Sequence, residues 1–181
     1  MKSLLILLLL FSSLYSYTYN TQIMQIYAKI APRLVLMTTG QKPLANKSIL
    51  IGILYAEGDR KSAKKLAELM HNAYPKGLEH SLLDIRLFTY KDVAALQNIS
   101  LLFFLENSPN VIEPILNFAK QKQILSIVYD NRLLAKGAMV SLYIGKTVKP
   151  YLNLKAVQQS GLSFDNVLMS ISKIYYNDEE Q

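Results

Sequence analysis

Three adjacent polar residues, Asp59, Arg60 and Lys61, separate a strongly apolar segment from a segment of helical periodicity. In open α/β sheets, ligands bind beyond the carboxyl ends of the strands, and the amino terminus of a helix attracts anions. Lys64 and Lys65 would add positive charge to the same region. These residues are therefore a candidate site for an anionic ligand or a partner. The alternative interpretation is a helix cap followed by a solvated helix face.

Residue types that commonly carry out catalysis or hold metals form no recognisable set in this sequence. The chain has no cysteine, and its two histidines, His71 and His80, lack partners at metal-ligand spacing. There is no glycine-rich nucleotide loop and no G-x-S-x-G motif. Glu106, Glu113 and Asp130 lie near expected strand ends, but nothing pairs two of them for acid–base catalysis. We therefore expect no enzymatic activity, no metal and no cofactor.

Composition and charge narrow the class of protein further. About half of the residues are apolar, which is enough for a packed core in a chain of 181 residues. The formal net charge is +7, a value compatible with nucleic acid, an anionic membrane surface, an acidic partner or simply a basic surface. No nucleic-acid-binding motif accompanies this charge, so we expect no nucleic-acid partner.

The first sixteen residues have the layout of a secretory signal peptide. A short basic start (residues 1–3) precedes an unbroken apolar run (residues 4–11), and small serines follow up to Ser16. The apolar run is shorter than the roughly 20 residues that span a bilayer. We expect residues 1–16 to direct export to the periplasm and to be cleaved after Ser16. A retained N-terminal membrane anchor is the alternative, because Leu14 lies where a small residue is preferred.

The remaining chain, residues 17–181, is expected to form one α/β domain. The apolar periodicity of residues 22–38 predicts a helix, which Pro32 should kink or split. Apolar runs of strand length then alternate with amphipathic helical segments, a pattern that favours a parallel sheet with right-handed crossovers. The expected strands are 48–55, 82–88, 99–105 and 124–129, and the expected helices are 60–74 and a helix from Pro109.

The C-terminal part of the chain changes character. Residues 138–144 and 147–152 flank Gly145-Lys146, which predicts a β-hairpin. Two helices should follow. The first should begin at Asn153 and stop at Gly161. The second should be capped by Ser163 and stapled by Leu162 and Val167, with an apolar face that includes Ile171 and continues to Ile174. The expected fold is thus a small mixed or parallel sheet with flanking helices, built from βαβ units, followed by a hairpin and two helices.

The C-terminal segment resembles a known family. Gly137-Ala-Met-Val-Ser-Leu, then Val148-Lys-Pro-Tyr-Leu-Asn153, then a short helix ending in Gly161-Leu is similar to the closing segment of the YfiR-like family. Members of the family also begin with a signal peptide and an amphipathic helix that contains a tyrosine. The corresponding tyrosine here is Tyr27. The resemblance implies a periplasmic protein without catalytic activity. The best-known member restrains an inner-membrane diguanylate cyclase by contacting its periplasmic part. Redox control through disulfides cannot carry over, because this chain has no cysteine.

Two functions follow as expectations. The first is an exported regulatory module that binds a protein partner at the inner membrane, such as a membrane-bound signalling enzyme. Tyr143 and Tyr151 are candidate partner contacts. The alternative is a periplasmic small-ligand-binding protein that resembles one lobe of a substrate-binding protein, in which a homodimer could supply the second lobe. Asn153 and Gly161, which the resemblance singles out, have structural explanations: a helix cap and a helix stop with positive φ.

Overall fold

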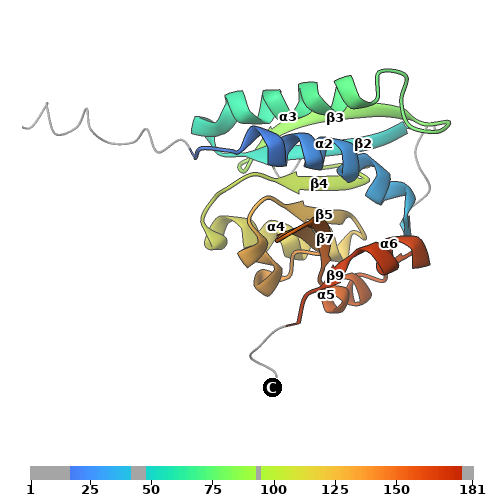
Figure 1. Ribbon diagram of the computed structural model, residues 1–181. Helices are drawn as coiled ribbons and strands as arrows, with labels where there is room; N and C mark the ends of the chain where they lie inside the picture. Colours follow the sequence, from blue (N-terminus) through green and yellow to red (C-terminus); the bar gives the residue numbers. More distant parts are fainter. Residues whose placement is uncertain (1–16, 42–47, 93–94, 177–181) are drawn as a thin grey trace, which may run out of the picture.

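The computed structural model describes residues 17–41, 48–92 and 95–176 (Figure 1). Its main sheet has seven strands in the order β3-β2-β4-β5-β6-β7-β9. All neighbouring strands are parallel except the β6–β7 hairpin. The strands are β2 (Ser48–Tyr55), β3 (Leu82–Thr89), β4 (Leu101–Phe104), β5 (Leu125–Val128), β6 (Val140–Ile144), β7 (Val148–Leu152) and β9 (Lys173–Ile174). A second, two-stranded sheet pairs β1 (Thr38–Thr39) with β8 (Ser163–Phe164).

Helices cover both faces of the main sheet. Alternate residues of β2 point to opposite faces, so Ile51 packs in the core beneath α2 and α3, whereas Leu54 packs in the core beneath α4. Figure 1 shows α3 running alongside β3. Burial on both faces explains why β2 reads as one continuous apolar run. The helices and helical turns are α2 (Thr21–Leu36), η2 (Glu57–Asp59), α3 (Arg60–Ala73), α4 (Pro109–Gln121), η4 (Asn131–Lys136), α5 (Leu154–Gln159) and α6 (Asn166–Ile171).

The α/β class predicted from the sequence is confirmed, and so is the alternation of strands and helices between residues 48 and 129. The predicted hairpin is present as β6 and β7. Pro32 does not split the first helix: α2 runs as one helix from Thr21 to Leu36, with Pro32 buried inside it. The predicted signal peptide falls on residues 1–16, which lie outside the described residues. Within the described ranges, no helix is both long and apolar enough to cross a membrane.

The prediction for the last helix is wrong in its cap and only partly right in its buried face. Ser163 belongs to β8, and the N-cap is Asp165, whose carboxylate accepts a hydrogen bond from the Leu168 N–H. Val167 is 62% exposed, so the staple does not form. Ile171 is 51% exposed, and of the predicted apolar face only Leu168 is fully buried. The physical reason is that the chain must leave the helix after Ile171, because β9 pairs with β7 immediately afterwards.

Candidate functional site

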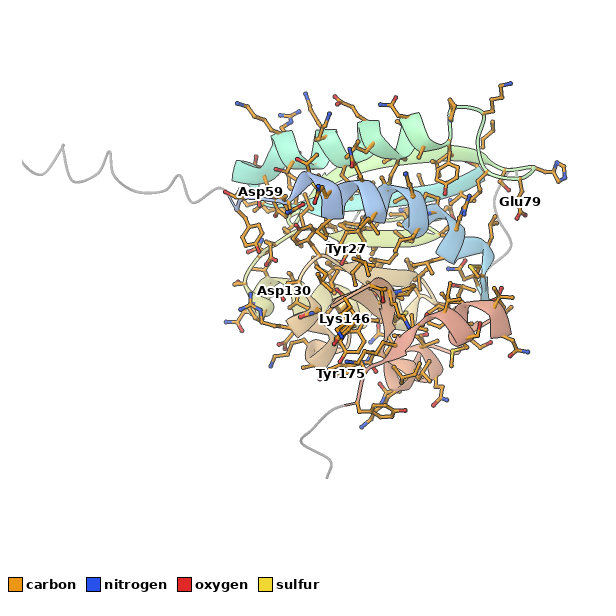
Figure 2. The ribbon with its side chains drawn as sticks, in the orientation of Figure 1. Tyr27, Asp59, Glu79, Asp130, Lys146 and Tyr175 are labelled. Carbon is orange, nitrogen blue, oxygen red and sulfur yellow. The ribbon has the colours of Figure 1, made fainter. Side chains whose placement is uncertain are left out.

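The carboxyl ends of β2 and β4 form the topological switch point of the sheet. From β2 the chain crosses to β3 on one side and later returns to β4 on the other side. The two crossover helices, α3 and α4, lie on opposite faces. In open α/β folds, a switch point of this kind is where ligands bind. The loops that follow β2, β4 and β5 place Asp59, Glu106 and Asp130 at this edge of the sheet. Figure 2 shows Asp59 and Asp130 at the same end of the molecule.

Tyr19, just before α2, lies across the switch point. Its hydroxyl donates a hydrogen bond to Asp59 Oδ2 at 2.9 Å and accepts one from the Glu106 N–H at 2.9 Å. The next residue, Asn20, donates its N–H to the Tyr129 hydroxyl at 3.0 Å. The segment before α2 is therefore tied to the loops after β2, β4 and β5, and a side chain of the protein itself occupies the position that favours ligands in this fold.

Tyr17, Tyr19 and Tyr129 pack edge-to-face at this position. The ring centroids are 4.9 Å apart for Tyr17–Tyr19 and for Tyr19–Tyr129, and 6.1 Å apart for Tyr17–Tyr129. This geometry suits the quadrupoles of aromatic rings. Burial raises the pKa of the Tyr19 hydroxyl, and the hydrogen bond to Asp59 raises it further, so Tyr19 stays protonated and able to donate. Tyr19 thus acts as a fixed hydrogen-bonding link and not as an acid or base near neutral pH.

Glu106 is the titratable group of this site. Its pKa is raised to about 7, mainly by desolvation and also by the negative charges of Asp130 and Asp59, against the opposing effect of Arg132. Arg132 lies 2.6 Å from Asp130 Oδ2 and forms an ion pair with that carboxylate. Among the described residues, no group of three or more His, Cys, Asp or Glu side chains could hold a metal ion. The arrangement therefore offers carboxylates and tyrosines for hydrogen bonding, and we assign no metal to it.

Replacing Glu106 by glutamine should remove a pH-dependent loss of stability. The Glu106 carboxyl has a pKa of about 7 in the folded chain, compared with 4.5 for an unperturbed glutamate. Between pH 4.5 and pH 7 the folded chain therefore holds this proton more tightly than the unfolded chain does. The contribution of the neutral carboxyl to the free energy of unfolding is therefore fully present below about pH 4.5, and it is lost as the pH rises through about 7. After allowance for solvent screening, we expect Glu106→Gln to be more stable than the wild type by about 1 kcal/mol at about pH 8 and equal to it near pH 4.

Chemical denaturation across this pH range measures the difference. Glu113→Gln is the matched control, because Glu113 makes an exposed ion pair with Lys136 on the surface of α4. We expect that change to alter stability by less than about 0.5 kcal/mol at every pH. Equal pH profiles for Glu106→Gln and the wild type would show that Glu106 does not titrate near neutrality.

Of the residues predicted for an anionic site, only Asp59 takes part in the hydrogen bonds of this network. Arg60 and Lys61 are exposed at the start of α3, and Asp59 holds the N-cap position without a side-chain cap hydrogen bond. Its buried carboxylate accepts from Tyr19 instead. His71 and His80 are exposed. Sequence reasoning missed Tyr19, because its partners lie 40 and 87 residues further along the chain. The one signal in the sequence was the close spacing of Tyr15, Tyr17 and Tyr19 around the end of the expected signal peptide.

Tyr143 and Tyr151, the candidate partner contacts, do lie together. Their ring centroids are 5.6 Å apart, and Tyr151 lies 5.6 Å from Tyr175 in turn. The Lys173 ammonium lies 3.6 Å from the centroid of the Tyr143 ring, a cation–π contact. We call Tyr143, Tyr151, Lys173 and Tyr175 the aromatic surface. It spans β6, β7 and β9 at the end of the sheet away from β3, and its three tyrosines are partly exposed.

Asn153 and Gly161 bracket α5 next to the aromatic surface. Asn153 is the N-cap: its side-chain oxygen accepts from the Ala156 N–H at 3.1 Å, and its side-chain nitrogen donates to the Leu134 carbonyl at 2.8 Å. Gly161 follows the helix with a φ of +75°, a conformation that favours glycine. A pocket of about 380 Å³ lies between α5 and the chain after β9, and its lining includes Asn153 and Tyr175.

Comparison with known proteins places these features in a family. A family model described as YfiR/HmsC-like matches residues 61–173, which is more than half of the chain and includes Tyr143, Tyr151 and Lys173. No curated protein sequence matches the chain.

Two solved structures share the fold. One is an ABC domain from Streptococcus pneumonia in complex with L-Trp, with a TM-score of 0.56 and 11% identity over 80% of this chain. The other is a conserved domain protein from Vibrio cholerae, with a TM-score of 0.58 and 15% identity over 83% of this chain. This chain spans 60% and 59% of those two proteins, respectively.

Proposed function

Because this chain belongs to the YfiR/HmsC-like family, we propose that it is an exported regulatory module that acts by binding a protein partner at the inner membrane. By analogy with the family, the partner is a membrane-bound signalling enzyme of the diguanylate cyclase type. In this proposal residues 1–16 are the signal peptide and residues 17–181 form the mature module. The chain itself carries out no chemistry: it changes the activity of its partner by contact.

The aromatic surface is the observation that carries this proposal. Tyrosine, together with tryptophan and arginine, is among the side chains that contribute most to binding at protein interfaces. Tyr143, Tyr151 and Tyr175 are stacked edge-to-face, so their rings are already ordered and little side-chain entropy is lost on binding. The adjoining hairpin also exposes Ile144 and Val148, but these side chains point to the opposite face of β6 and β7 and lie outside the aromatic surface.

A crosslinking pull-down from native cells tests the proposal. The wild-type chain with a C-terminal tag should recover an inner-membrane protein with a periplasmic segment, identified by mass spectrometry. The double variant Tyr143→Ser/Tyr151→Ser should recover at least about tenfold less of it, since interface tyrosines commonly contribute about 1–2 kcal/mol each. Tyr17→Ser is the matched control, because Tyr17 is 46% exposed and belongs to the tyrosine cluster at the switch point. Recovery of nothing but copies of the chain itself would contradict the proposal.

Small-ligand binding at the switch point is the second candidate function. It is supported by the position of Asp59 and Glu106 at that edge and by the likeness to a domain whose solved structure holds L-Trp. A ligand would have to displace the Tyr19 hydroxyl and replace its hydrogen bonds to Asp59 and to the Glu106 N–H. Titration calorimetry with free amino acids tests this candidate. Heat of binding with the wild-type chain that is lost in Asp59→Asn would favour small-ligand binding. The absence of heat with every amino acid would rule this candidate function out.

A further inference from the structure

The strand β3 presents a long open edge. It pairs with β2 over its whole length, from Ser48↔Leu82 to Tyr55↔Thr89, and it is the terminal strand of the main sheet among the described residues. Open edges are templates for pairing with another chain, and proteins usually protect them. At the start of this edge the side chain of Leu82 is 69% exposed. The edge therefore has both unpaired backbone groups and exposed apolar area.

The direction of the backbone groups along β3 can be assigned from two hydrogen bonds. The Leu82 carbonyl accepts from the Ser48 side chain of β2, so the backbone of Leu82 faces β2. The Thr89 N–H donates to Asp92 Oδ2 and faces away from β2. Because directions alternate from residue to residue along a strand, the N–H and C=O groups of residues 83, 85 and 87 point outward. These are the groups that a second strand would meet.

The side chains of β3 are self-complementary about Ile85. Asp84 and Arg86 flank it, Leu83 and Leu87 come next, and Leu82 and Phe88 lie outside them. If two copies pair antiparallel about a two-fold axis at Ile85, each Asp84 faces Arg86 of the second copy. Each Leu83 then faces Leu87, and each Leu82 faces Phe88. The same register places the outward N–H and C=O groups of residues 83, 85 and 87 opposite one another, so every one of these pairs can exchange both hydrogen bonds.

We propose that the chain forms a homodimer through antiparallel pairing of β3 with β3 of a second copy, with the two-fold axis at Ile85. The charges of Asp84 and Arg86 support a second copy of the chain as the partner of this edge. Asp84 and Arg86 form an ion pair within one strand at 2.6 Å, with both side chains about half exposed. In the dimer they lie in pairs that are not hydrogen bonded, where side chains of facing strands are closest. An isologous contact of this kind closes the assembly at two copies.

The packing on the two faces is consistent with a second copy. Leu83, Ile85 and Leu87 pack against the core beneath α3 but are only partly buried. The facing leucines and isoleucine of the second copy would complete that burial along the sheet. β3 and the aromatic surface lie at opposite ends of the strand order, so the dimer leaves both aromatic surfaces free. The inference therefore does not depend on the proposed function.

A charge-swap series tests the dimer by sedimentation equilibrium on protein expressed from the full sequence. The wild-type chain should dimerise. Arg86→Asp places an aspartate opposite Asp84 at both symmetry-related positions, and we expect the dimer dissociation constant to rise about tenfold or more. The double variant Asp84→Arg/Arg86→Asp restores opposite charges in the same register and should return the constant to within about threefold of the wild type. This rescue excludes a failure to fold as the cause. Lys61→Asp, on the exposed side of α3, should leave the constant unchanged.

A cysteine at the axis tests the register. The chain has no cysteine, so Ile85→Cys introduces one thiol per copy. Facing residues of a hydrogen-bonded antiparallel pair have Cα atoms about 5.5 Å apart, which a disulfide can bridge. Oxidation should therefore give a covalent dimer for Ile85→Cys and monomer for Ser62→Cys on α3. A wild-type chain that stays monomeric, a dimer that Arg86→Asp does not weaken, or an Ile85→Cys dimer that does not crosslink would overturn the proposal.

Discussion

Tyr27→Ala is expected to lower the free energy of unfolding by about 4 kcal/mol, and Tyr27→Phe by about 2 kcal/mol. Tyr27 is 1% exposed, and its ring packs edge-to-face against Phe103 with centroids 4.9 Å apart. Its hydroxyl donates to the Val128 carbonyl at 2.9 Å and accepts from the Leu142 N–H at 3.2 Å. The hydroxyl therefore joins the end of β5 to the middle of β6, two strands that pair directly only at Ile127↔Val140.

The two substitutions separate the two contributions of Tyr27. Tyr27→Phe keeps the ring and leaves the buried Leu142 N–H without its acceptor, whereas Tyr27→Ala also creates a cavity next to Phe103. Urea denaturation measures both. Tyr74→Phe is the matched control, because the Tyr74 hydroxyl donates to the Lys29 carbonyl at the surface, and its loss should cost less than about 0.5 kcal/mol. If Tyr27→Phe were as mild as Tyr74→Phe, the hydroxyl would not be what joins β5 to β6.

Asn153→Ala should cost about 2 kcal/mol of stability. The substitution removes the side-chain cap of α5 and leaves the buried Leu134 carbonyl without the side-chain N–H that it accepts. Asn153→Asp keeps the acceptor for the Ala156 N–H but places a carboxylate against the Leu134 carbonyl, so we expect it to cost at least as much. These two bonds give a physical reason for an asparagine between the hairpin and α5 in the segment that resembles the family.

Thermal and urea unfolding of both variants check this expectation. Asp165→Ala removes the N-cap of α6, which is less buried, and should cost only about 1 kcal/mol. If Asn153→Asp kept wild-type stability, the Leu134 carbonyl would not need the hydrogen bond from the Asn153 side chain. Asn153 would then not be a structural link between η4 and α5.

The sequence was most informative where local pattern and tertiary packing agree. The run 48–55 is apolar on both faces because helices cover both faces of β2, so its identity as a buried strand could be predicted from composition alone. The amphipathic pattern of α3 and the proline at the start of α4 also predicted their elements closely.

The failures lie where distant parts of the chain decide the local structure. The last helix was expected to continue to Ile174, but that residue pairs in β9 with β7, a contact that no local pattern encodes. The switch-point network was missed for the same reason: Tyr19 is joined to Asp59 and Glu106 by the topology of the sheet and not by spacing. Pro32 was expected to interrupt the first helix, yet it is buried within α2.

Photocrosslinking in intact cells tests most directly whether the aromatic surface binds a protein partner. A photoreactive amino acid would replace Lys149, which is exposed on the same face of β7 as Tyr151, and in a second strain Lys64 on the exposed side of α3. We predict that position 149 crosslinks to an inner-membrane protein and that position 64 does not. Crosslinks from position 64 but not from position 149 would contradict the account, as would crosslinks from position 149 only to copies of the chain itself.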